Sequence, residues 1–140
     1  MADAVRHARE AVRIKPDDDR VHFNLGNVMS ASRAPDEAVR EFRRAVQLNP
    51  ENADAHLNLA LLVGPQGKLD EAVVHLRRAI EINPQYAEAF RNLSVALVLH
   101  GRITEAIQAA RQALRIQPGS VEAQKQLDLL LGAESQHRGR

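Results

Sequence analysis

Residues 53–86 read ADAHLNLALLVGPQGKLDEAVVHLRRAIEINPQY, and this pattern recurs along the chain with a period of 34 residues. Prolines, leucines and alanines keep the period in four columns: Pro16, Pro50, Pro84 and Pro118; Leu25, Leu59, Leu93 and Leu127; Ala4, Ala38, Ala72 and Ala106; and Ala11, Ala45, Ala79 and Ala113. A self-similar period of this size is typical of a repeat array. Such an array is expected to present a surface rather than to carry out a reaction.

Each unit is predicted to hold two helices. In the quoted unit, apolar residues recur at helical spacing on both sides of Gly67, which marks a tight turn. Asn83-Pro84 ends the second helix, because the residue before a proline avoids the α conformation. Pro65 has no backbone N–H to donate, so the first helix is expected to end near Val63. The predicted helices are 2–14, 19–32, 35–48, 53–64, 69–82, 87–99, 103–116 and 121–131.

The period divides the chain into three full units with partial units at both ends. The full units are 19–52, 53–86 and 87–120. Residues 1–18 correspond to a second helix only, 121–131 to a terminal capping helix, and 132–140 to a polar tail that is expected to be disordered. Because short helices cannot bury their apolar faces alone, neighbouring units must stack. An array cut within a unit at both ends suggests a piece of a longer protein.

Composition restricts the possible functions. Lys and Arg number 19 against 18 Asp and Glu, so no global field attracts the chain to nucleic acid. The absence of cysteine excludes disulfides, thiolate metal sites and cysteine nucleophiles. No apolar run approaches the ~20 residues that span a bilayer, and no signal peptide is recognisable. We therefore expect neither nucleic-acid binding nor membrane insertion, and the default location is cytoplasmic.

The repeat columns resemble the tetratricopeptide-repeat family, whose unit is a helix–turn–helix of 34 residues. The second unit matches that pattern at His56, Leu59, Ala60, Val63, Ala72, Leu76, Ala79 and Pro84, and the other units follow it. Gly26, Ala60 and Ser94 are small, as two closely packed helices require. The resemblance implies an all-α superhelix, or solenoid, of stacked antiparallel helix pairs, with no catalytic residue, cofactor or metal.

The resemblance also places the binding site. In this family the first helices line a concave groove that binds extended or helical peptides. The corresponding residues are Arg20, Phe23, Asn24, Asn27, Asp54, Leu57, Asn58, Leu61, Glu88, Arg91, Asn92, Val95 and Leu99, continued by Glu122, Lys125, Gln126 and Leu129. Phe23, Glu88 and Asn92 stand where cations would be needed to clamp a C-terminal carboxylate, so we exclude that class of partner.

Asn24, Asn58 and Asn92 form a polar column in the groove. An amide offers both donors and an acceptor, so such a ladder can bond the backbone of an extended peptide regardless of its sequence. The column resembles the tetratricopeptide superhelix of the O-linked N-acetylglucosamine transferases, which hold substrate peptides in this way. The alternative is that these amides bond neighbouring helices or water.

Histidine and arginine columns are interpreted as structural. His22 and His56 lie in a packing column, and the six histidines show no metal-binding spacing. Arginines on the outer side of the second helices are interspersed with glutamates, which predicts a solvated, ion-paired face: Arg43, Arg44, Arg77, Arg78 and Arg111 with Glu41, Glu81 and Glu105.

The sequence thus predicts a non-catalytic protein–protein interaction module that binds a peptide segment in its groove. Two alternatives remain open. The chain is the substrate-recognition region of a longer enzyme, such as a protein glycosyltransferase, or it is a scaffold that self-associates through its exposed terminal helices.

Overall fold

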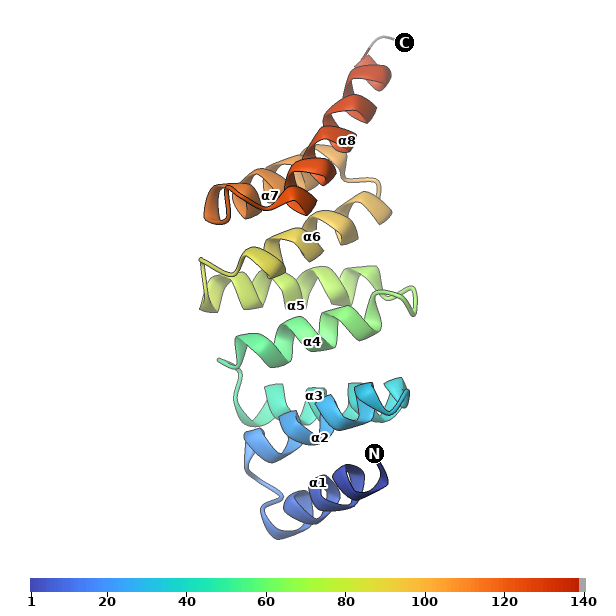
Figure 1. Ribbon diagram of the computed structural model, residues 1–140, viewed down its shortest axis with the longest axis vertical. Coiled ribbons are helices and arrows are strands. Elements are labelled where there is room, and N and C mark those ends of the chain that lie inside the picture. Colours follow the sequence, from blue (N-terminus) through green and yellow to red (C-terminus); the bar gives the residue numbers. More distant parts are fainter. Residues whose placement is uncertain (139–140) are drawn as a thin grey trace.

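The computed structural model describes residues 1–138, in which eight α-helices stack in chain order and no strand occurs (Figure 1). The helices are α1 (Ala2–Ile14), α2 (Asp19–Ala31), α3 (Pro35–Leu48), α4 (Ala53–Val63), α5 (Leu69–Ile82), α6 (Ala87–Leu99), α7 (Ile103–Ile116) and α8 (Val121–Arg138). Each helix packs mainly on the helices before and after it in the sequence. The prediction of an all-α repeat solenoid is confirmed.

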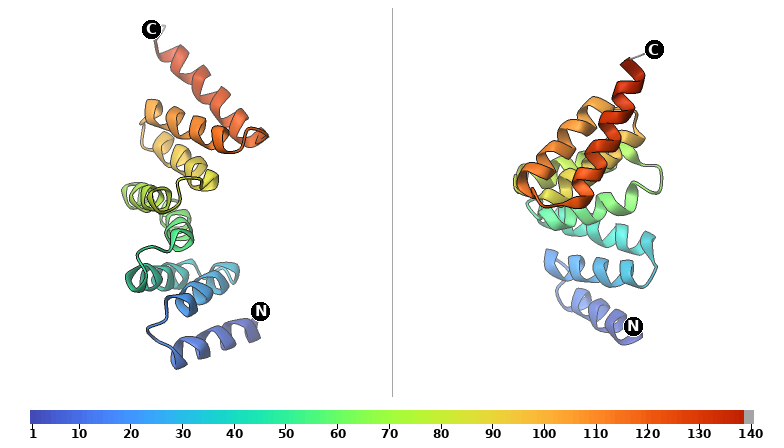
Figure 2. Two further views of the ribbon diagram at one scale, coloured as in Figure 1. Left: turned by 90° about the vertical axis from the view of Figure 1, so that its left-hand side faces the viewer. Right: turned by 45° about the horizontal axis from the view of Figure 1, so that its top comes forward.

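The helices lie in two layers, seen side by side when the stack is turned (Figure 2). We call α2, α4 and α6 the first-helix layer, and α3, α5 and α7 the second-helix layer. The two helices of a unit make the most extensive contacts, and the second helix of one unit packs on the first helix of the next. The first-helix layer therefore presents equivalent residues from consecutive units on one face.

Prolines and asparagines set the helix ends, as the sequence indicates. The second helices α3, α5 and α7 all end two residues before Pro50, Pro84 and Pro118. The side chain of Asn49 accepts a hydrogen bond from the backbone N–H of Glu51 at 3.2 Å, which fixes the turn that follows. α4 ends at Val63, as expected from Pro65, and is shorter than α2 and α6.

Small and large residues alternate across the core. Leu59, Leu97 and Phe42 are among the largest fully buried side chains. Three alanines of one periodic column are also buried: Ala38, Ala72 and Ala106. Ser94 is fully buried, and its hydroxyl donates to the backbone oxygen of Ala106 at 2.8 Å. This bond satisfies a polar group that would be costly to bury alone.

The C-terminal segment departs from the prediction of a disordered tail at 132–140. α8 continues to Arg138, and residues 139 and 140 lie outside the described part of the chain. Ala123, Leu127 and Leu130 hold the helix on α7, and Ser135 donates to the backbone oxygen of Leu131 at 2.8 Å. No proline interrupts residues 131–138, and the helix continues through Gly132 past the end of its apolar face.

Four of the five arginines expected in ion pairs on the outer side form them in the described part of the chain. Arg43 bonds Glu71 at 2.8 Å, and Arg77 bonds Glu105 at 3.0 Å. None of the described helices is long and apolar enough to cross a membrane.

Candidate functional site

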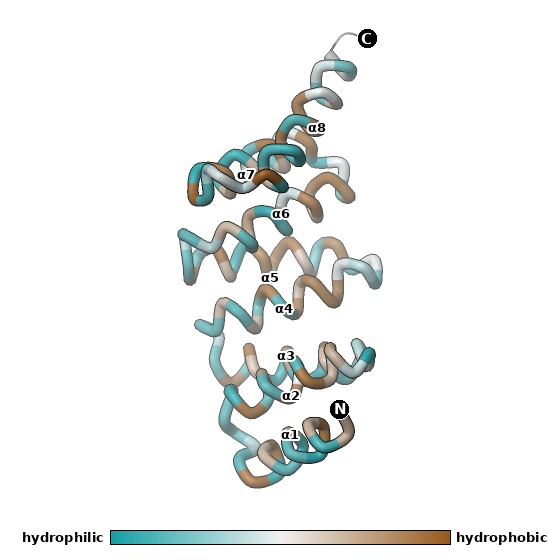
Figure 3. The backbone as a smooth tube through the Cα atoms, in the orientation of Figure 1, coloured by the Kyte–Doolittle hydropathy of each residue, from teal (hydrophilic) through white to brown (hydrophobic). Residues whose placement is uncertain are grey.

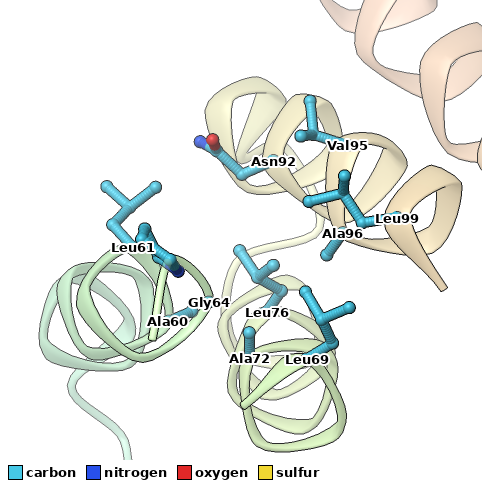
Figure 4. A pocket seen from close by; sticks show the side chains of 11 residues that line it. Ala60, Leu61, Gly64, Leu69, Ala72, Leu76, Asn92, Val95, Ala96 and Leu99 are labelled. Carbon is cyan, nitrogen blue, oxygen red and sulfur yellow. The ribbon is translucent and has the colours of Figure 1, made fainter. Parts of the chain in front are cut away.

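Two pockets lie in equivalent positions of consecutive units. The larger one, the apolar pocket, has a volume of about 370 Å³ and lies between α4 and α6, with α5 as its floor (Figure 4). It is lined by Ala60, Leu61, Gly64, Pro65, Leu69, Ala72, Leu76, Asn92, Val95, Ala96 and Leu99. Asn92 is its single polar residue. The C-terminal halves of α4 and α6 form the apolar end of the first-helix layer (Figure 3).

The sequence creates the apolar pocket through small residues and an early helix end. Ala60, Ala72 and Ala96 line it from three different helices and leave the space between them open. Gly64-Pro65 ends α4 two residues earlier than its counterparts, and both residues line the pocket. Leu69 and Leu76 of α5 supply the large apolar side chains (Figure 4).

The second pocket, the polar pocket, has a volume of about 300 Å³ and lies one unit earlier, between α2 and α4. It is lined by Asn27, Ser30, Ala31, Phe42, Asn58, Leu61 and Leu62. Asn27 and Ser30 stand 34 residues before Leu61 and Gly64 of the apolar pocket. The two units therefore offer different chemistry at the same structural position.

The asparagine column is partly engaged within the protein. Asn24 is exposed. Asn58 donates through Nδ2 to Oδ1 of Asn27 at 3.0 Å, and Asn92 donates through Nδ2 to the backbone oxygen of Glu88 at 2.9 Å. Each bonded amide still has a second N–H and its own oxygen. The column can therefore bond a ligand without losing its internal hydrogen bonds.

Most charged groove residues already have partners. Arg20 binds Asp18 at 2.8 Å, and this bond lowers the pKa of Asp18 to about 2. Asp54 accepts a hydrogen bond from the Tyr86 hydroxyl. Burial, together with that carboxylate, raises the pKa of Tyr86. Arg91 binds Glu122 of α8 at 2.7 Å, so the groove is largely neutralised by its own ion pairs.

Leu57 was expected in the groove, and this expectation is wrong. Its side chain is 2% exposed and belongs to the hydrophobic core, so it cannot contact a ligand. Phe23, at the equivalent position of the first unit, is half-buried and stacks at a tilt on Phe42, with ring centroids 5.8 Å apart. In contrast, Val95 and Leu99 are 48% and 66% exposed.

The sequence did not reveal the pocket-forming residues of α5 or the role of Gly64. Pro65 predicts the early end of α4, and that end is the signal from which the pocket could have been inferred. His22 and His56 are buried as predicted, but both are hydrogen-bonded rather than merely packed. Among the side chains that the structure describes, no three of His, Asp or Glu converge as metal ligands would.

The sequence model described as TPR repeat matches residues 36–64 and 65–101. The comparison with curated proteins found no match.

Solved structures show the same fold at low sequence identity. The crystal structure of MamA is 23% identical with a TM-score of 0.89, over 94% of this chain and 77% of that chain. The first TPR of Spaghetti (RPAP3), bound to the HSP90 peptide SRMEEVD, is 21% identical with a TM-score of 0.81, over 84% of this chain and 94% of that chain.

Proposed function

Because this chain belongs to the tetratricopeptide-repeat family, we propose that it is a non-catalytic protein-interaction module that binds a peptide segment along its first-helix layer. The observation that carries the proposal is the apolar pocket, together with the exposed side chains of Leu61, Val95 and Leu99 around it. Clustered apolar surface of this kind is typical of an interaction site. The volume of the apolar pocket, about 370 Å³, suits one or two side chains of a peptide rather than a folded domain.

Peptide binding by the same fold supports the proposal. The RPAP3 repeat domain is bound to an HSP90 peptide that ends in acidic residues. This chain is not suited to such an acidic tail, because Glu88 would repel it and the cations Arg20 and Arg91 already bind carboxylates. We therefore propose a peptide partner of a different kind.

The test is binding of peptides selected from a random 12-residue display library on the immobilised protein, with affinities measured by calorimetry. Leu99→Asp places a charge at the rim of the apolar pocket and should weaken the selected peptides about tenfold or more. Val74→Asp is the matched control, since Val74 is 64% exposed but lies on α5 outside the pocket. If both variants bind as tightly as the wild type, the first-helix layer is not the binding site.

The asparagine column is proposed to bond the peptide backbone. A net hydrogen bond contributes ~0.5–1.5 kcal/mol, so Asn24→Ala should weaken every selected peptide about 2- to 13-fold. Among the described residues, none bonds the exposed side chain of Asn24, so its loss should leave the thermal midpoint unchanged. Asn58→Ala also removes the bond to Asn27. Variants that lose stability and bind normally would show that the amides are structural.

A further inference from the structure

We propose that the peptide partner carries a large aliphatic side chain and, four residues away, a lysine or arginine. The aliphatic side chain enters the apolar pocket, and the cation pairs with Glu88. This inference rests on the proposed function and specifies its ligand.

The chemistry of the apolar pocket selects the first side chain. Ten of its eleven lining residues are apolar, and no charged residue lines it. A charged or strongly polar side chain would lose its hydration there without gaining a partner. The exposed side chains of Val95 and Leu99 form its outer wall, so an aliphatic side chain from solution can reach it without opening the core.

The charge beside the pocket selects the second side chain. Glu88 lies one helical turn before Asn92, and the bond from Asn92 Nδ2 to the Glu88 backbone oxygen ties that turn together. The Glu88 side chain is exposed, and no described residue forms an ion pair or hydrogen bond with its carboxylate. The nearest cation on the same helix, Arg91, is bound to Glu122 instead.

Glu88 is distinguished from its equivalents in the neighbouring units. Asp54, one unit earlier, accepts a bond from Tyr86, and Glu122, one unit later, binds Arg91. Of these three carboxylates, that of Glu88, beside the apolar pocket, is thus the one available to bind a ligand. A cation there would be attracted, whereas an acidic side chain would be repelled.

The spacing follows from backbone geometry. On α6, Glu88 lies seven residues before Val95 and eleven before Leu99, which corresponds to rises of about 10 and 17 Å at ~1.5 Å per residue. An extended peptide advances about 3.3 Å per residue, and its side chains i and i+2 point to the same side. Side chains i and i+4 also point to the same side, so a segment lying along α6 covers the distance from the pocket wall to Glu88 in about four residues.

The experiment is an array of 10-residue peptides built from Ser, Gly and Asn, in which only two positions, separated by three residues, are varied. Wild-type protein should favour Leu, Ile or Met at one position and Lys or Arg at the other. Glu88→Lys should reverse the second preference to Asp or Glu, by about tenfold in relative binding, and keep the first. Asp36→Lys is the matched control, because Asp36 is another exposed carboxylate in the first turn of a helix, but on α3.

The possible outcomes separate this inference from the function on which it rests. If Leu99→Asp abolishes array binding but the preference at the second position does not change with the charge at residue 88, the groove binds peptides and the proposed cation is refuted. If binding is indifferent to Leu99→Asp, both proposals fail. If wild-type protein sediments as a dimer and Leu99→Asp as a monomer, a second copy occupies the pocket and the peptide motif is overturned.

Discussion

Arg33 adopts a backbone conformation that the other units assign to glycine. Its φ is 57°, and the equivalent residues one and two units later are Gly67 at 82° and Gly101 at 76°. A residue with a Cβ is strained in this region, whereas glycine is not. The first unit therefore makes the same turn as the others at a cost in stability.

Replacing this arginine by glycine should stabilise the protein. Arg33→Gly relieves the backbone strain, whereas the greater freedom of glycine in the unfolded chain offsets part of this gain. We therefore expect the free energy of unfolding to rise by about 0.5–1 kcal/mol. Urea unfolding monitored by circular dichroism measures it. Gly101→Ala is the reverse control, because a Cβ there would meet no atom within 4 Å and only the backbone strain remains. A loss of stability in Arg33→Gly would contradict the assignment of this turn.

Gly26 and Phe42 are matched in size across the first unit. A Cβ on Gly26 would lie 2.7, 2.8 and 3.0 Å from three ring carbons of Phe42, which is buried and cannot swing away. At the equivalent positions, the second unit has Ala60 and Leu76. As the residue of the first helix grows by a methyl group, its partner on the second helix becomes smaller.

This complementarity predicts a compensating double variant. Gly26→Ala should cost ~1–3 kcal/mol by overpacking, and Phe42→Leu should also destabilise by leaving space. Together they reproduce the pair of the second unit, so the double variant should be more stable than the sum of the single losses by about 0.5–3 kcal/mol. Thermal and urea unfolding of all four proteins tests this. Additive losses would show that the two positions do not contact each other.

At the scale of the helices, a pair of histidines connects α4 to α5. His56 Nε2 lies 3.0 Å from the backbone oxygen of Pro50, so it carries the proton and donates. His56 Nδ1 then accepts from His75 Nδ1, at 2.9 Å. His75 Nε2 lies 3.9 Å from the carboxylate of Glu71, and this ring nitrogen can bind a further proton. The first unit has His22 and Glu41 at these two positions, 2.7 Å apart.

This pair should make the second unit sensitive to acid. Desolvation lowers the pKa of both His56 and His75. Arg78 lowers the pKa of His56 further and Glu51 raises it, and Arg43 and Glu71 act in the same two ways on the pKa of His75. The unfolded chain, with an ordinary histidine pKa near 6.5, then binds more protons than the folded chain. Stability is therefore full above about pH 6.5 and falls as the pH decreases, by up to about 1.4 kcal/mol per pH unit for each histidine.

The test compares urea midpoints at pH 7.5 and 5.0 for the wild type and His75→Glu. The variant installs the His–Glu arrangement of the first unit, so most of the loss at pH 5.0 should disappear. His100, whose pKa is raised by its bond to Asp70, acts in the opposite direction but is common to both proteins. An equal loss in the two proteins would show that the His56–His75 pair is not the acid-sensitive element.

Helix boundaries could be predicted from the sequence because they depend on local chemistry. The prolines and Gly67 determine the helix ends independently of the rest of the fold, and Pro65 predicts the early end of α4. The burial of Leu57 and the pairing of His56 with His75 depend on how each helix is rotated against its neighbour. The 34-residue period does not contain that information. The apolar pocket has the same origin, because three helices combine to make it.

At the scale of the whole molecule, arginine–glutamate pairs connect consecutive second helices. Each arginine bonds a glutamate 28 residues later, on the next helix of the layer: Arg9 to Glu37, Arg43 to Glu71 and Arg77 to Glu105, at 2.7, 2.8 and 3.0 Å. The bond from Arg43 lowers the pKa of Glu71. The pairs repeat with the unit, so they couple neighbouring units in the same way along the array.

Breaking an inner pair should therefore affect cooperativity as well as stability. Each pair is partly exposed and contributes only ~0.2–1 kcal/mol, but the stability of a repeat array depends on its nearest-neighbour interfaces. Arg43→Glu places two like charges at the α3–α5 junction and should broaden the urea transition, whereas Arg9→Glu loosens only the end helix α1. Arg43→Glu combined with Glu71→Arg should restore a sharp transition, and 0.5 M salt should reduce the difference between these proteins because it screens exposed charges. If Arg43→Glu lowers the midpoint without changing the slope, or if the charge swap fails to restore it, the units are held together by their apolar contacts alone.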